Sequence, residues 1–269
     1  MESSSSPADC ERQEQSRSIM LNYAQALSSG SYGRSVRGCG VVSENLAKVR
    51  QRIAAACERG GRDPEEVKIV AVTKTHPVEV VREAIAASIN IIGENRVQEA
   101  EAKYTKIDAD IEWHLVGHLQ RNKVRKALSI FSMIHSLDSL RLAAEIEKES
   151  TKLDKLTPCL IEVNTSAEET KFGVAPDELA GLVAEVLNLE HIKLVGLMTI
   201  GPLTQDKDRI RRSFVLLREL RDRAESVFGC YLPHLSMGMS EDFEIAVQEG
   251  ATMLRLGRVL FGPRQSFGA

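Results

Sequence analysis

Apolar positions near the start of the chain follow a helical period. Leu46, Val49 and Ile53 recur three or four residues apart, which predicts an amphipathic helix. Ser43 is a suitable N-cap before them, and the glycine pair at 60–61 ends the pattern. We therefore expect a helix that precedes the first strand of the fold.

The period then changes to that of buried strands, and strands and helices alternate along the rest of the chain. The β-branched run Val67–Thr73 predicts the first strand, and the segment from Pro77 to Ala87 predicts the helix after it. Further strands are predicted at Ile89–Gly93, Ile111–Gly117, Met133–Leu137, Thr157–Asn164, Ile192–Ile200, Leu232–Met237 and Thr252–Gly257. Further helices are predicted at Leu140–Lys152, Pro176–Leu189, Ile210–Phe228 and Asp242–Glu249.

Eight predicted strands separated by helix-length segments favour a single α/β domain, a (βα)8 TIM-type barrel with an extra N-terminal helix. A doubly wound open sheet is the alternative, because the sequence does not show whether the first and last strands pair. We expect the domain to span residues 42–269. Residues 1–41 are rich in Ser, Gly, Arg and Gln without apolar periodicity, so we expect a disordered tail there.

Composition and charge narrow the class of protein. The 269 residues are 43% hydrophobic and 27% charged, which suits one large core. The 35 Lys and Arg against 38 Asp and Glu give a net charge of -3, which disfavours a uniformly basic nucleic-acid surface. The sequence has neither an apolar run long enough for a membrane span nor a secretory signal. We expect a cytoplasmic protein without nucleic-acid or membrane partners, while the tail leaves mitochondrial or plastid targeting open.

Three other groups of residues suggest chemistry that their context disfavours. His114 and His118 are four residues apart, but they fall on a strand and its exit loop, so we expect no metal site. Glu94 and Asp138 suit salt bridges at a barrel rim better than acid–base catalysis. The five cysteines form no CxxC pair and are interpreted as reduced thiols, with Cys159 in the core.

Candidate chemistry gathers where the predicted strands end, which is where β/α barrels bind ligands. Lys74 follows the first strand, and partial desolvation at the mouth of an apolar barrel would favour a neutral amine able to form a Schiff base. A solvated lysine is the other interpretation. After the seventh and eighth strands come small and cationic residues suited to an anion, namely Ser236, Gly238, Ser240, Arg255 and Gly257. An amine and an anion site on one rim suit a phosphorylated aldehyde.

Eight segments together resemble the pyridoxal phosphate homeostasis protein family. They are AVTK (71–74), GENRVQE (93–99), WHLVGHLQRNK (113–123), HSLDS (135–139), VNTSAEETKFG (163–173), GLMTIG (196–201), LSMGMSEDFEIAV (235–247) and RLGRVLFGPR (255–264). They occur in the family's order between about Ser43 and Arg264. One departure is Arg96, which stands where the family commonly has an aromatic residue.

The resemblance implies a barrel related to the N-terminal domain of alanine racemase, with pyridoxal 5'-phosphate (PLP) held covalently by Lys74 as an internal aldimine. It assigns Arg255 to the ring of the cofactor, and Asn95 and Met198 to the pocket lining. Ser240 with its preceding turn and the backbone of residues 257–258 would hold the phosphate. The cofactor-binding residues implied are therefore Lys74, Asn95, Met198, Ser236, Gly238, Ser240, Arg255, Gly257 and Arg258.

The resemblance also implies a carrier that buffers PLP or delivers it to PLP-dependent apo-enzymes, without established catalysis. We expect the protein to be a monomer. An arginine at the pyridine nitrogen leaves that nitrogen unprotonated and a poorer electron sink, so at most a weak side activity is expected. The enzyme alternative is a PLP-dependent amino-acid racemase or decarboxylase of barrel type. A cofactor-free aldolase that forms a Schiff base through Lys74 is a further alternative.

Overall fold

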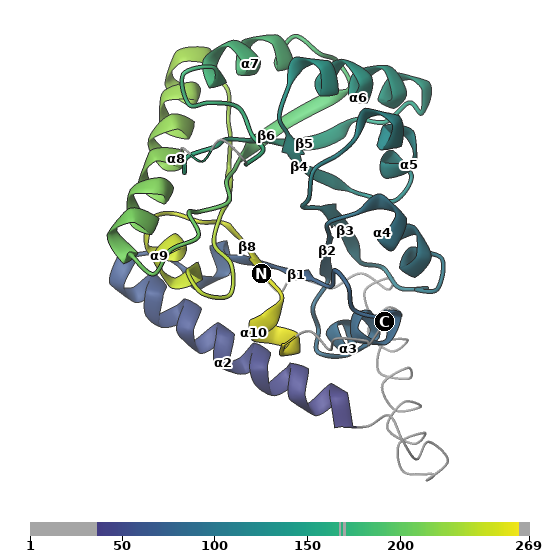
Figure 1. Cartoon of the computed structure of the whole chain (residues 1–269), viewed down its shortest axis with the longest axis vertical. Helices are drawn as coiled ribbons and strands as arrows, with labels where there is room; N and C mark the ends of the chain where they lie inside the picture. Colours follow the sequence, from purple (N-terminus) through teal and green to yellow (C-terminus); the bar gives the residue numbers. More distant parts are fainter. Residues whose placement is uncertain (1–36, 167, 169–170, 264–269) are drawn as a thin grey trace, which may run out of the picture.

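A closed barrel of eight parallel strands forms the centre of the protein, as seen in a computed structural model that describes residues 37–166, 168 and 171–263 (Figure 1). The strands are β1 (Lys68–Val72), β2 (Ile91–Glu94), β3 (Glu112–Leu115), β4 (Met133–Leu137), β5 (Thr157–Glu162), β6 (Ile192–Met198), β7 (His234–Ser236) and β8 (Met253–Leu256). The barrel closes because β1 pairs with β8, with Val70 opposite Arg255. The predicted barrel is confirmed, and the open-sheet alternative is wrong.

Helices surround the strands on the outside of the barrel (Figure 1). They are α2 (Arg37–Gly60), η1 (Pro64–Glu66), α3 (Val78–Ala86), α4 (Val97–Tyr104), η2 (Arg121–Lys123), α5 (Val124–Leu128), α6 (Leu140–Lys152), α7 (Leu179–Val186), α8 (Lys207–Phe228), α9 (Phe243–Gln248) and α10 (Arg258–Phe261). Of these, η1, α4, η2, α5 and α10 were not predicted. Helix α2 begins at Arg37 and so includes residues that we expected in the tail; the expectation for residues 1–36 falls outside the described residues.

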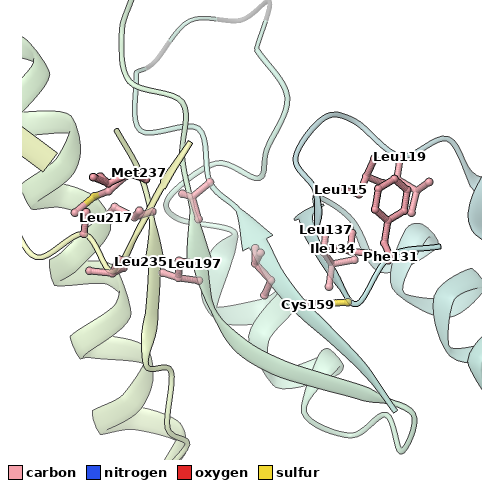
Figure 2. Packing of buried hydrophobic residues seen from close by; sticks show 14 of the residues in the cluster. Leu115, Leu119, Phe131, Ile134, Leu137, Cys159, Leu197, Leu217, Leu235 and Met237 are labelled. Carbon is pink, nitrogen blue, oxygen red and sulfur yellow. The ribbon is translucent and has the colours of Figure 1, made fainter. Parts of the chain in front are cut away.

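Two apolar layers follow from the alternation of side chains along each strand. One layer fills the barrel interior with Val70, Val72, Ile91, Val116, Met133, Leu160, Val195, Met198 and Met253. The other layer lies between the strands and the helices, and it includes Cys159 as predicted. Figure 2 shows part of this outer layer, with Leu197 and Leu235 on the strand side and Leu217 of α8 beside them. Each strand is therefore buried on both faces.

Helix α2 packs against α3, α9 and α10, on the side where the barrel closes (Figure 1). Its apolar face, which includes Leu46, Val49 and Ile53, is buried. Asn45 Nδ2 donates to Leu260 O at 2.9 Å, and Arg52 pairs with Glu244 at 3.1 Å. Within the described residues, the model contains no helix with the length and apolar character needed to cross a membrane.

A glycine in β6 sets the spacing between β6 and β7. Gly196 has a φ of +155°, and a Cβ built on it would lie 1.9 Å from the carbonyl oxygen of His234, its register partner. No L side chain fits there without moving the backbone of one strand. The barrel wall therefore depends on this residue having no side chain.

Candidate functional site

The carboxyl ends of the strands bring most of the predicted site residues to one rim of the barrel. Lys74 is half-buried and follows β1 with only the buried Thr73 between. Met198 and Ser236 end β6 and β7, and Asn95 follows β2. Because all strands are parallel, these positions lie at the same end of the barrel.

Arg255 is a buried cation whose guanidinium is held in one orientation. It is 5% exposed, and Nη1 donates to both the carbonyl oxygen and the Oγ of Ser236 at 2.7 Å. Nη2 donates to Thr199 O at 2.7 Å. Burial lowers the pKa of Arg255 to about 10, while Glu162 and Asp242 act in the opposite direction. The side chain is thus cationic at neutral pH and fixed by two other strand ends.

A hydrogen-bonded chain continues from Arg255 through the barrel interior. Ser236 Oγ accepts from Arg255 and lies 2.9 Å from His135 Nδ1. His135 Nε2 lies 3.1 Å from His114 Nδ1, and His114 Nε2 lies 3.1 Å from the Glu112 carboxylate. Burial, and then the neighbouring His114 and Arg255, hold the pKa of His135 well below its usual 6.5.

The two histidines considered for a metal pair lie in different surroundings. His114 is inside the barrel, whereas His118 is exposed and stacks on Phe172, with ring centroids 4.1 Å apart. His118 Nδ1 also lies 3.1 Å from Asp138 Oδ2. In the part of the chain that the structure describes, no group of three or more His, Cys, Asp or Glu residues is arranged to hold a metal ion.

The loops after β7 and β8 meet beside Arg255. Ser240 Oγ accepts the Val259 N–H at 3.2 Å, which joins the loop after β7 to α10. Gly238 has a φ of +92°, and a Cβ there would lie 2.6 Å from that of Ala246. Arg258 turns its exposed side chain to Glu241 at 2.9 Å. The loops therefore offer a hydroxyl and backbone groups rather than the Arg258 guanidinium.

Glu162 is a buried acid at the end of β5 that the sequence reading missed. It is 4% exposed and lies close enough to Arg255 for their charges to interact. Burial raises its pKa to about 7, with Arg255 lowering it and Asp138 raising it. An acidic residue in the inward phase of an apolar strand, two positions after Leu160, was the signal that could have found it.

Glu162→Gln is expected to raise the free energy of unfolding of the cofactor-free protein above pH 7. The folded-state pKa of about 7 exceeds the reference value of 4.5, so the ionised carboxylate costs stability as pH rises through that window. The amide does not ionise, and at about 1.4 kcal/mol per pKa unit the gain is on the order of 3 kcal/mol. Urea denaturation at pH 8 and at pH 4.5 measures it, with no gain expected at the lower pH.

Glu112→Gln is the control for that prediction. The hydrogen bond from His114 lowers the pKa of Glu112, so its ionised form stabilises the fold at neutral pH, and the amide should lose this contribution. Equal stabilisation by Glu162→Gln at both pH values would contradict a titrating carboxyl at position 162.

Glu94 forms a salt bridge as expected, but the pair is buried rather than at the solvated rim. Its Oε1 lies 2.6 Å from Lys103 Nζ of α4, and the Glu94 side chain is fully buried.

A separate cavity of about 620 Å³ lies at the opposite end of the barrel, lined in part by Arg50, Lys68 and Glu112. That cavity is lined by none of the predicted site residues.

Known proteins of similar sequence match most of the chain. The family model of the alanine racemase N-terminal domain matches residues 44–265. A pyridoxal phosphate homeostasis protein of Aquifex aeolicus is 47% identical over 223 residues, which are 82% of this chain and 98% of that protein. The protein of the same name from Escherichia coli is 38% identical over 231 residues, or 83% and 97% of the two chains.

Solved structures share the barrel. PipY of Synechococcus elongatus with PLP bound is 35% identical with a TM-score of 0.73, covering 82% of this chain and 100% of PipY. Alanine racemase of Clostridium difficile in complex with cycloserine is 16% identical with a TM-score of 0.68, covering 86% of this chain and 61% of the racemase. The second comparison is a likeness of fold alone.

Proposed function

Because the chain belongs to the pyridoxal phosphate homeostasis protein family, we propose that it binds PLP through Lys74 and holds the cofactor for PLP homeostasis. The observation that carries the proposal is the position of Lys74 on the same barrel rim as the buried, fixed guanidinium of Arg255 and the loops after β7 and β8. The PLP-bound PipY structure supports the choice of cofactor.

The chemistry of the donors fits the three functional parts of PLP. Lys74 supplies an amine for the aldehyde, and Arg255 a fixed cation for the ring. The Ser240 hydroxyl and the backbone at 238–240 and 257–258 suit a phosphate, because small residues let the anion approach N–H groups. The proposed set is the one expected from the sequence: Lys74, Asn95, Met198, Ser236, Gly238, Ser240, Arg255, Gly257 and Arg258.

These residues would bind the cofactor without strongly promoting catalysis by it. Lys74 Nζ would attack the aldehyde carbon, form a carbon–nitrogen double bond and release water. When bound, PLP supplies an electron-withdrawing ring that can stabilise a carbanion on an attached amino acid. Arg255 is a cation whose N–H groups donate, so it opposes protonation of a facing ring nitrogen and weakens that electron sink. We therefore propose storage, or delivery to PLP-dependent apo-enzymes, as the role.

An absorption spectrum of the purified protein, before and after borohydride reduction, tests this function. Mass mapping of the reduced protein is expected to find one pyridoxyl adduct, on the peptide that carries Lys74. A colourless protein that cannot be reconstituted with PLP would overturn the proposal. Steady loss of optical activity from an amino acid would instead favour the racemase alternative over a carrier.

Arg255→Gln is expected to weaken retention of PLP by about 1 to 3 kcal/mol, the scale of a lost charge-assisted hydrogen bond. Equilibrium dialysis against a PLP acceptor measures the change. Arg82→Gln is the matched control, because the Arg82 side chain is exposed, pairs with Glu79 on the surface and lies outside the proposed set. Retention equal to wild type in Arg255→Gln would count against a role for this guanidinium in the site.

A further inference from the structure

Helix α4 faces the segment that carries Lys74 with two charged side chains one turn apart. Glu99 Oε2 accepts the Thr75 N–H at 3.0 Å, and Lys103 Nζ donates to the Thr73 carbonyl oxygen at 2.7 Å. Residues four apart lie on the same face of a helix. Thr73 and Thr75 flank Lys74, so α4 holds the backbone on both sides of this residue.

The contacts that hold Thr73 include a buried ion pair between Lys103 and Glu94. Lys103 Nζ lies 2.6 Å from Glu94 Oε1, and the Thr73 hydroxyl donates to the same oxygen at 2.5 Å. Lys103 is 7% exposed, and Glu94 and Thr73 are fully buried. Among the described residues no group hydrogen-bonds the second carboxylate oxygen of Glu94. Burial raises the pKa of Glu94, and the attraction of Lys103 opposes that rise.

Stability alone is a poor reason for such an arrangement. An apolar pair of similar volume often serves a core equally well, because removing two charges from water is costly. The backbone after Lys74 is strained as well: Thr75 is β-branched and has a φ of +64°. A strained residue persists only where its surroundings hold it, and strain of this kind collects at functional sites. The hydrogen bond from Thr75 N–H to Glu99 is one of the contacts that keep Thr75 in this conformation.

We infer that Glu99 and Lys103 of α4, together with Glu94, are positioning residues for the Lys74 amine. This inference rests on the proposed function, in which Lys74 carries the covalent link to PLP. The three side chains contact the peptide groups and the hydroxyl around Lys74, and they act through that backbone. They set the direction of Nζ toward the aldehyde, whereas the loops after β7 and β8 bind the phosphate independently of them.

Two ligands separate positioning from general damage. PLP reports on the covalent link together with noncovalent binding of its phosphate and ring, while pyridoxine 5'-phosphate has an alcohol in place of the aldehyde and reports on the noncovalent binding alone. Glu99→Ala is expected to weaken PLP binding about tenfold, the order for a lost charge-assisted hydrogen bond that orients a reacting group. Binding of pyridoxine 5'-phosphate to the same variant should equal that of the wild type.

Glu99→Gln should restore PLP binding, because the amide oxygen still accepts from Thr75 N–H. Glu101→Ala is the matched control on α4, since Glu101 pairs with Lys126 on the surface. The double variant Glu94→Leu with Lys103→Met keeps the volume of the buried pair without its charges, and it should weaken PLP selectively as well.

Equal weakening of both ligands in Glu99→Ala, or PLP binding equal to the wild type, would overturn the inference. The proposed function fails by a different result, which is the absence of a borohydride-stable adduct on Lys74 in the wild-type protein. Measuring that adduct first keeps the two outcomes apart.

Discussion

Lys74→Ala is expected to abolish the pyridoxyl adduct that borohydride fixes in the wild-type protein. Only an amine can close the carbon–nitrogen bond to the aldehyde, and alanine offers none. The fold should persist, because the barrel closes through residues Lys68 to Ala71 of β1, and the side chain of Lys74 lies beyond the end of that strand. PLP should still bind weakly and reversibly, through Arg255 and the loops after β7 and β8.

Intact-mass measurement after reduction gives the adduct count, and a thermal melt checks the fold. Lys68→Ala is the matched control, since Lys68 is an exposed lysine at the opposite end of the same strand. It should carry the adduct at the wild-type level. A wild-type amount of adduct in Lys74→Ala would show that another lysine holds the cofactor.

Gly196→Ala is expected to lower the free energy of unfolding by about 4 kcal/mol or more, a range reached by few single substitutions. The new Cβ would stand 1.9 Å from the carbonyl oxygen of His234 and 2.7 Å from its carbonyl carbon. Both atoms are backbone within the barrel wall, so relief requires β6 and β7 to separate. The φ of +155° adds strain for any L side chain.

Gly181→Ala provides the opposite expectation within the same protein. Gly181 lies inside α7, and a Cβ there meets nothing within 4 Å. Alanine should stabilise that helix by up to about 1 kcal/mol, because glycine loses more backbone entropy on folding. Urea midpoints of the two variants and the wild type compare them directly. A Gly196→Ala midpoint at or above that of the wild type would mean that the strands separate easily at this point.

The barrel was predictable because its strands are buried on both faces. Within the predicted strand Val67–Thr73, residues 69–72 form a continuous apolar run, and β4 was predicted with its observed bounds, Met133–Leu137. The short helices were missed because each of them buries only a few residues. Helix α4 buries only Val97, Ala100 and Lys103, so its sequence shows little apolar periodicity. The pairing of β1 with β8 depends on the geometry of the whole chain, which local patterns do not contain.

The candidate site, like the fold, could be predicted only where the signal is local in the sequence. Lys74 and Ser240 could be named as candidates because strand ends and small residues can be recognised locally. The partners of Arg255 were not, since Thr199 is 56 residues away, and the bond between His135 and Ser236 spans 101 residues. The contacts of Glu99 and Lys103 with the backbone on either side of Lys74 were missed because they depend on which face α4 turns to β1.

The closure of β1 onto β8 also determines when the site can exist. Lys74 is synthesised early, whereas Arg255 and the loops at 238–240 and 257–258 come near the end of the chain. At translation rates of roughly 5 to 20 residues per second, about 10 to 40 s pass between the synthesis of β1 and the synthesis of its partner β8. The packing of helix α2 is delayed as well, because Asn45 donates a hydrogen bond to Leu260, which is synthesised 215 residues later. A nascent chain therefore carries the lysine without the loops proposed to bind the phosphate, and we expect the cofactor to be captured only after synthesis of the barrel is complete.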